Sequence, residues 1–217
     1  MTAADRLASI NADITSAAKL AGRKREDITL VAVSKTRSAQ EIEELIVAGQ
    51  RNFGENRVQE AQLKWPELRA RYPDIRLHCI GRLQSNKAAE AVALFDIIHS
   101  LDRPSLLDAL VTEAAKAGRT PSVYVQVNIG EEEQKGGCPI AEAGALIDAV
   151  RTSSLPLAGL MAIPPLGVEP TPYFALLAKL ARRHDVAGLS IGMSADFRSA
   201  VMVGATIVRV GTALFEA

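Results

Sequence analysis

The chain has 217 residues, of which 48% are hydrophobic and only 4% aromatic, a composition typical of an aliphatic globular core and not of a disordered chain. Basic and acidic residues balance at 25 each, so bulk charge gives no reason to expect binding to nucleic acid or to an anionic membrane. No apolar run reaches the roughly 20 residues that span a bilayer, and the N-terminus lacks the apolar core of a signal peptide.

The two cysteines, Cys79 and Cys138, do not have the spacing of a metal site. We therefore expect two reduced thiols, no bound metal and a cytoplasmic location.

Segments with strand character alternate with segments of helical spacing along the whole chain. Strands are predicted over residues 28–35, 51–56, 75–80, 96–99, 123–128, 157–163, 188–191 and 207–211. Helices are predicted over residues 2–22, 38–48, 103–117, 141–150 and 172–183, with others ending near Ala70, Ala93 and Gly204.

Eight strands that alternate with helices predict an α/β fold, a (β/α)8 TIM barrel with an extra N-terminal helix. No linker divides the chain, so we expect a single domain over residues 1–217. The competing fold is a doubly wound open sheet. It has little support, because no G-x-G-x-x-G sequence follows any predicted strand.

The first predicted strand ends on Lys35, which shares a face with Val31 and Val33 because side chains alternate along a strand. If that face lines a barrel, the amine lies at the carboxyl ends of the strands, where barrel enzymes keep their chemistry. The position alone is compatible with a phosphate-binding charge, an ion-pair partner or a Schiff-base nucleophile.

The last two predicted strands run into turns of small residues, Gly192-Met193-Ser194 and Gly211-Thr212. Such turns let backbone N–H groups approach an anion, and these two loops are the usual phosphate site of a barrel. Arg209 lies two residues before Gly211 and on the same face, although a buried ion pair is an alternative reading of it. A lysine, an arginine and a phosphate site together fit pyridoxal 5′-phosphate, with Lys35 as its Schiff-base partner.

Other polar residues give weaker signals. We expect His78 and His99 to be hydrogen-bonded core or rim residues. The loop of residues 84–87 is expected to serve a ligand that the sequence does not identify, because it follows a strand at the active end of the barrel. Residues 131–137 are expected to form a solvated loop, placed where a lid over the pocket could lie.

Six stretches of the sequence resemble the pyridoxal phosphate homeostasis protein family, in order and over nearly the whole chain. They are residues 31–36, 53–60, 78–87, 159–165, 189–196 and 208–213. The resemblance implies a barrel like the N-terminal domain of alanine racemase, with pyridoxal 5′-phosphate joined to Lys35 as a Schiff base.

The same resemblance implies roles for the other site residues. Ser194 would bind the phosphate together with the backbone N–H groups of Gly211 and Thr212, and Arg209 would face the pyridine nitrogen. Asn56 and Met193 would line the pocket. Two departures from the family pattern are Arg82, where histidine is common, and the missing arginine near residues 171–174, which puts in doubt a second anion site there.

Arg209 also bears on activity, because a guanidinium keeps its protons and cannot protonate the ring nitrogen as a carboxylic acid could. Racemases of this fold also need a second acid/base on the opposite face, and none of Tyr72, Tyr124 and Tyr173 is placed for it. We therefore expect a non-catalytic, monomeric carrier or regulator of pyridoxal 5′-phosphate, with apo-enzymes or amino and keto acids as partners. The alternatives are a racemase or lyase of low activity and a barrel that binds another phosphorylated metabolite without covalent chemistry.

Overall fold

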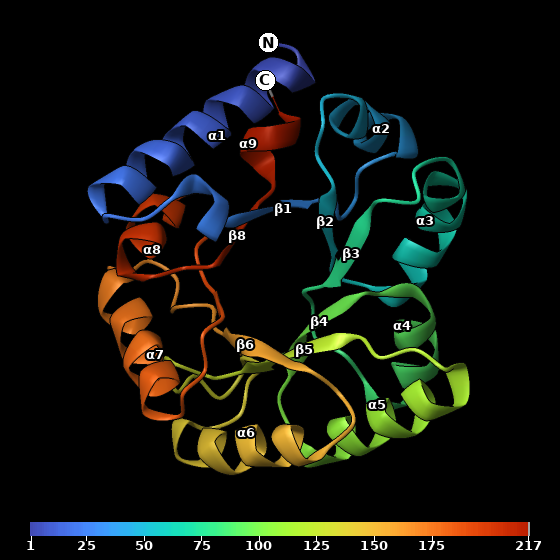
Figure 1. Ribbon diagram of the computed structural model, residues 1–217, viewed down its shortest axis with the longest axis vertical. Coiled ribbons are helices and arrows are strands. Elements are labelled where there is room, and N and C mark those ends of the chain that lie inside the picture. The colour runs from blue at the N-terminus through green and yellow to red at the C-terminus, as the bar shows by residue number, and fades with distance from the viewer. Residues whose placement is uncertain (217) are drawn as a thin grey trace.

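The computed structural model describes residues 1–216, and its strands close into a parallel barrel in the order β1 to β8 (Figure 1). The strands are β1 Thr29–Val33, β2 Asn52–Glu55, β3 Arg76–Cys79, β4 Ile97–Leu101, β5 Ser122–Gln126, β6 Leu157–Met161, β7 Leu189–Ser190 and β8 Ile207–Val210. The predicted eight-stranded barrel fold is confirmed.

Helices follow the strands and form the outer ring of Figure 1. The α-helices are α1 Ala3–Leu20, α2 Ala39–Val47, α3 Val58–Arg71, α4 Ala88–Leu94, α5 Pro104–Ala117, α6 Ala143–Thr152, α7 Thr171–Arg183, α8 Phe197–Val203 and α9 Thr212–Phe215. Short 3-10 helices are η1 Arg25–Asp27, η2 Ser85–Lys87 and η3 Ile140–Glu142.

The N-terminal helix α1 is additional to the repeating strand–helix units, as predicted. It packs against α8, α9 and α2 and covers the junction where β8 meets β1 (Figure 1). Its N-terminus carries a capping box of Thr2 and Asp5. A capping box of Ser38 and Glu41 likewise begins α2.

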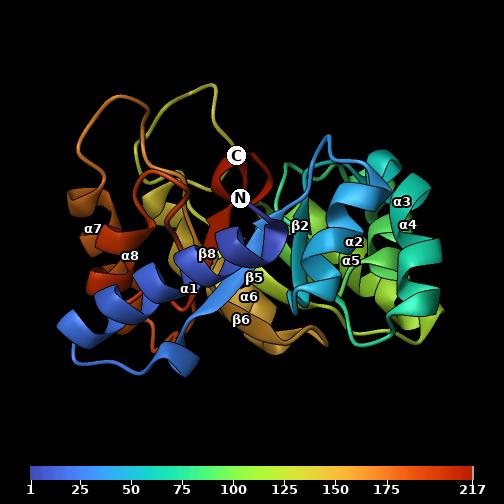
Figure 2. The ribbon, with the colours of Figure 1, turned by 90° about the horizontal axis from the view of Figure 1, so that it is seen from above.

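All strand pairs are parallel, so the strands end together at one face of the barrel. β1 pairs with β2 through Ala32 and Phe53, and with β8 through Ala32 and Val210, which closes the sheet. Figure 2 shows the segments after β5 and β6 rising above this face, whereas η1, which precedes β1, lies on the opposite side. Residues at the strand ends are therefore brought together although they are far apart in sequence.

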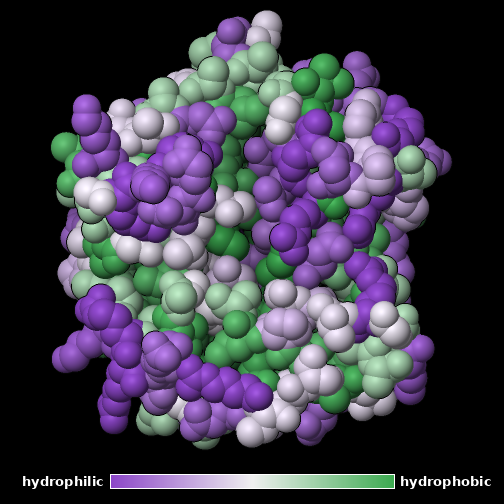
Figure 3. Space-filling model, viewed as in Figure 1, coloured by the Kyte–Doolittle hydropathy of each residue, from purple (hydrophilic) through white to green (hydrophobic). Residues whose placement is uncertain are grey.

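The barrel has an apolar layer inside and a second apolar layer between its sheet and the helices. The inner layer contains Val31, Ile97, Tyr124, Met161 and Ile207. The outer layer is larger, and in it the ring of Phe53 packs at 5.1 Å from the ring of Trp65. In Figure 3 hydrophilic residues form several clusters on the face seen in Figure 1, and hydrophobic residues come to the surface between them, some near its middle.

Some boundaries differ from the predicted ones. β1 ends at Val33, so Lys35 lies in the turn after the strand and not in the strand itself. β7 has only two residues, because the chain leaves the sheet at Gly192, whose φ of +90° is incompatible with strand geometry. No helix within residues 1–216 is long and apolar enough to cross a membrane.

Candidate functional site

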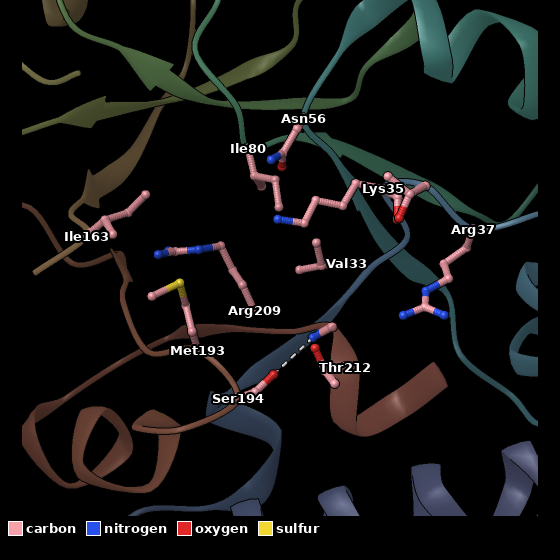
Figure 4. A pocket seen from close by; sticks show the side chains of 12 residues that line it. Val33, Lys35, Arg37, Asn56, Ile80, Ile163, Met193, Ser194, Arg209 and Thr212 are labelled. Carbon is pink, nitrogen blue, oxygen red and sulfur yellow. Dashed lines mark hydrogen bonds between the residues drawn. The ribbon is translucent and has the colours of Figure 1, made fainter. Parts of the chain in front are cut away.

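A pocket of about 270 Å³ opens at the face where the strands end (Figure 4). It is lined by Val33, Lys35, Thr36, Arg37, Asn56, Ile80, Ile163, Met193, Ser194, Arg209, Gly211 and Thr212. All seven site residues proposed from the sequence are in this set. They lie in or after β1, β2, β7 and β8, so these four strands contribute to one cavity. What each residue binds stays a prediction.

Lys35 reaches into the pocket from the turn after β1. In Figure 4 its side chain passes beside Val33, and its amine is directed toward the side of the pocket where Arg209 lies. The residue is exposed, because β1 has already ended at Val33. The nearby carboxylates of Glu41 and Glu216 pair with Arg37 instead, and within residues 1–216 no ion pair involves Lys35. The ion-pair reading of this lysine therefore has no support in the structure.

The turn that carries Lys35 is held in an unusual conformation. Thr36 has a φ of +62°, in the left-handed region that β-branched residues rarely adopt. Its hydroxyl donates to the carbonyl of Lys35 at 2.6 Å. Strained residues of this kind occur where the surrounding structure imposes them, often at functional sites.

Arg209 in β8 is only 4% exposed and is held by oxygen atoms of neighbouring strands. It donates to the carbonyl of Ser190 and to the hydroxyl of Ser190, each at 2.6 Å, and to the carbonyl of Ala162 at 3.1 Å. Burial lowers the pKa of the guanidinium to about 10, so it stays protonated at neutral pH. The alternative reading of a buried ion pair is wrong, because these partners are neutral.

The loops after β7 and β8 meet at Ser194 and Gly211. The backbone N–H of Gly211 donates to the hydroxyl of Ser194 at 3.3 Å (Figure 4). Gly192 makes the preceding turn possible, since a Cβ there would lie 2.6 Å from the Cβ of Ala200. Small residues in both loops leave room for an anion at the place where barrels commonly bind phosphate.

Asn56 also owes its position to a glycine. It follows β2, and Gly81 after β3 approaches its backbone so closely that a Cβ on Gly81 would lie 2.2 Å from the carbonyl oxygen of Asn56. No larger residue fits at position 81 without moving Asn56.

A buried carboxylate behind Lys35 was not among the residues singled out from the sequence. Glu55 is fully buried and accepts hydrogen bonds from the hydroxyl of Ser34 at 2.7 Å, from Lys64 at 2.8 Å and from Trp65 at 3.0 Å. Lys64 also donates to the carbonyl of Ser34 at 3.0 Å. These contacts tie the residue before Lys35 to β2 and α3. The sequence did contain one signal for this carboxylate, because Glu55 is an acidic residue within the predicted strand 51–56.

The two predicted core histidines form a hydrogen-bonded row inside the barrel. His78 Nδ1 lies 2.9 Å from His99 Nε2, and His99 Nδ1 lies 2.8 Å from the hydroxyl of Ser190, which also contacts Arg209. At the other end, His78 Nε2 lies 3.1 Å from Oδ1 of Asn52. We call the five residues Arg209, Ser190, His99, His78 and Asn52 the buried relay. The connection of the two histidines to Arg209 through Ser190 could not be read from the sequence.

Other predicted features lie outside the pocket. In the loop of residues 84–87, the hydroxyl of Ser85 accepts from Arg103 at 3.1 Å. The loop of residues 131–137 is fastened by Lys135, which donates to the carbonyl of Pro164 at 2.9 Å. Both cysteines are buried, which raises the pKa of each thiol to about 12. No three His, Cys, Asp or Glu side chains of residues 1–216 gather in a group suited to a metal ion.

The hydrogen bonds of Glu55 with Ser34, Lys64 and Trp65, which we call the brace, lead to a prediction about stability. Glu55→Gln removes the charge that pairs with Lys64, and we expect the free energy of unfolding to fall by about 3 kcal/mol, as when one partner of a buried ion pair is lost. Urea denaturation measures this change. The matched control is Glu60→Gln on α3, which breaks an exposed pair with Arg57 and should cost less than about 1 kcal/mol. Equal effects of the two substitutions would contradict the role of the brace.

The two buried histidines predict a loss of stability on mild acidification. Burial lowers the pKa of His78 to about 3 and that of His99 well below its usual value. Between pH 7 and pH 5 the unfolded chain takes up protons on both imidazoles, near a pKa of about 6.5, whereas the folded protein does not. Each histidine then lowers the free energy of unfolding by about 2 kcal/mol at pH 5. Urea unfolding at pH 7, 6 and 5 measures the sum. A free energy of unfolding that stays flat over this range would show that the imidazoles are protonated inside the barrel.

Comparison with known proteins agrees with this architecture. Residues 6–217 match the family model described as alanine racemase, N-terminal domain. An alanine racemase of Clostridium difficile has the same fold, with a TM-score of 0.71 at 14% identity, over 94% of this chain and 58% of that one.

Two full-length relatives are much more similar. The pyridoxal phosphate homeostasis protein of Pseudomonas aeruginosa is 41% identical over 223 residues, which cover 100% of this chain and 96% of that protein. The structure of PipY from Synechococcus elongatus with PLP bound is 39% identical, with a TM-score of 0.84 over 98% of this chain and 99% of that one. The chain therefore belongs to the pyridoxal phosphate homeostasis proteins, within the family of alanine racemase N-terminal domains.

Proposed function

We propose that the chain binds pyridoxal 5′-phosphate in the pocket of Figure 4 and holds it as a Schiff base on Lys35. The observation that carries the proposal is that Lys35, Arg209 and the loops after β7 and β8 line one cavity. Its volume of about 270 Å³ is near the lower end of the roughly 300–1,000 Å³ found for small-molecule sites. The PLP-bound structure of PipY gives independent support, because that protein is 39% identical over nearly its whole length.

The chemistry of the lining residues fits this cofactor. The amine of Lys35 would hold the cofactor through its aldehyde carbon, with water as the leaving group. Ser194 and the backbone N–H groups of Gly211 and Thr212 bind the phosphate, and Arg209 lies toward the ring nitrogen. Asn56 and Met193 contribute the remaining polar and apolar contacts, as the resemblance to the family implied.

The bound cofactor would supply an electron sink for reactions at the α-carbon of amino acids. Arg209 would weaken that sink, because a guanidinium that stays protonated could hydrogen-bond to the ring nitrogen but would give it no proton. The chain thus favours holding the cofactor over activating it.

The pocket also lacks a second group for proton transfer. Its lining, taken from residues 1–216, contains no aspartate, glutamate, histidine, cysteine or tyrosine. Tyr72 donates to Glu43, and Tyr124 stacks on His99 inside the barrel, so neither reaches the pocket. We infer a carrier or regulator that maintains the intracellular supply of pyridoxal 5′-phosphate. Five further properties stay predictions. They are delivery to apo-enzymes, an effect on amino and keto acids, a monomeric state, a single domain over residues 1–217 and a cytoplasmic location.

A second candidate function is that of a racemase or lyase of low activity, with Lys35 as its base. It is favoured by the same pocket, since Lys35 lies at the end of the barrel where enzymes of this fold carry out their reactions. The third candidate, noncovalent binding of another phosphorylated metabolite, requires only the loops after β7 and β8.

Trapping the imine tests the proposed cofactor site. Purified protein is mixed with pyridoxal 5′-phosphate, its visible spectrum is recorded, and borohydride reduction is followed by peptide mass mapping. We expect a Schiff-base band that becomes a stable adduct on the peptide containing Lys35. Lys35→Ala should abolish both, whereas Lys24→Ala, which removes an exposed lysine outside the pocket, should change neither. An adduct spread over surface lysines, or no band, would leave only noncovalent binding.

Exchange with solvent deuterium separates a carrier from a catalyst. With the cofactor bound, we expect incorporation at the α-position of an amino acid to be far slower than about 1 per second, the lower end of typical enzyme turnover. The measurement is by mass spectrometry of a panel of amino acids in deuterium oxide. Exchange at enzymatic rates that is lost in Lys35→Ala would favour the racemase or lyase instead.

A further inference from the structure

The buried relay crosses the barrel from the pocket to the opposite mouth. Arg209 lines the pocket where the strands end, and Asn52 is the first residue of β2. Asn52 and His78 line a separate cavity of about 300 Å³, which is bordered by other residues that begin strands, among them Thr29 and Ile207. The inner layer of the barrel also contains the apolar cluster of Val31, Ile97, Tyr124, Met161 and Ile207. Burying four polar side chains beside such a cluster is unfavourable unless they are hydrogen-bonded, so the relay calls for an explanation.

The donors and acceptors of the relay can be assigned from the proton count of each group. Arg209 can only donate, so the hydroxyl of Ser190 accepts from it at 2.6 Å. That hydroxyl has one proton of its own, and its other recorded side-chain partner is His99 Nδ1 at 2.8 Å. If Nδ1 donated instead, the proton of this completely buried hydroxyl would have no acceptor among residues 1–216, so we assign His99 Nδ1 as the acceptor.

The remaining assignments follow from neutral imidazoles. A neutral His99 that accepts at Nδ1 carries its proton on Nε2 and donates to His78 Nδ1 at 2.9 Å. His78 then carries its proton on Nε2 and donates to Oδ1 of Asn52 at 3.1 Å. Every bond of the relay runs in one direction, away from Arg209, because Ser190, His99 and His78 each accept from one neighbour and donate to the next.

Packing supports the same arrangement. The ring of His99 stacks on Tyr124 with centroids 4.5 Å apart and planes 9° from parallel, which fixes the plane in which His99 can form hydrogen bonds. His99 and Ser190 are both completely buried, so the hydroxyl cannot turn to water instead.

We propose that Ser190 and His99 are positioning residues that fix the guanidinium of Arg209 toward the cofactor ring, and that His78 and Asn52 lock their hydrogen-bond direction from the opposite mouth of the barrel. The part of the proposal that concerns the cofactor rests on the proposed function. A carboxylate could also hold an arginine, but it would neutralise the charge that Arg209 presents to the pocket. The relay orients the guanidinium with neutral groups and leaves its charge intact.

The first arm of the test uses the protein without added cofactor. Long-range ¹H–¹⁵N spectra of the histidine-labelled protein report which ring nitrogen carries the proton. We expect both His78 and His99 to be the Nε2–H tautomer, unchanged between pH 5 and pH 8. Ser190→Ala removes the hydroxyl that His99 Nδ1 accepts from, and His99 should become a mixture of tautomers. Ser190→Thr restores a hydroxyl and should restore the single tautomer.

The second arm adds pyridoxal 5′-phosphate. In Ser190→Ala the Schiff-base band should shift and the cofactor should bind about fivefold more weakly, the effect of losing about one net hydrogen bond. The matched control is Ser100→Ala, because Ser100 is a buried serine next to His99 whose hydroxyl has no hydrogen-bond partner within residues 1–216. This variant should behave as the unmodified protein in both arms.

The outcomes separate the two proposals. No Schiff base on Lys35 of the unmodified protein would overturn the proposed function, and with it the role of the relay toward the cofactor. A Schiff base whose band and affinity are the same in Ser190→Ala would overturn the relay alone. An Nδ1–H tautomer of His99 in the unmodified protein would overturn the assigned direction of the hydrogen bonds.

Discussion

A buried guanidinium with neutral partners is the interaction around which the inside of this barrel is arranged. Removing the charge of Arg209 from water is unfavourable unless the guanidinium is hydrogen-bonded, and two carbonyl groups and one hydroxyl accept three hydrogen bonds from it. These oxygen atoms belong to β7 and to the residue after β6, so the guanidinium also fastens β8 to its neighbours. Because β7 forms only a two-residue strand, this contact supplements a short stretch of the sheet.

The pocket depends on two sets of buried polar residues that lie behind its lining. On one side, Glu55 and Lys64 hold Ser34, and thereby the turn from which Lys35 extends. On the other side, the buried relay holds Arg209. The exposed side chain of Lys35 thus extends from a turn whose preceding residue is hydrogen-bonded to buried groups. Such support is what a site needs to hold a ligand in one geometry.

Among residues 1–216, Lys35 is the one lysine in the lining, and no aspartate, glutamate, histidine, cysteine or tyrosine accompanies it. A distant relative by fold is an alanine racemase, but its chain is longer, and this chain covers only 58% of it. Within residues 1–216 the pocket offers an amine, two guanidinium groups, hydroxyls and an amide. The same barrel can therefore serve a carrier or a catalyst, depending on a few side chains at the strand ends.

The sequence alone determined the barrel and seven of the residues that line the pocket. Alternating strand and helix patterns follow from local hydrophobic spacing, and the parallel barrel then places strand ends at one face, which is why Lys35, Ser194, Arg209 and Gly211 could be grouped in advance. Only the tertiary structure decided which buried polar groups meet. Glu55 and Lys64 are nine residues apart, but Ser190 and His99 are 91 residues apart, and nothing in either local sequence specifies the other. Hydrogen bonds between strands depend on register and barrel closure, which arise from the packing of the whole chain.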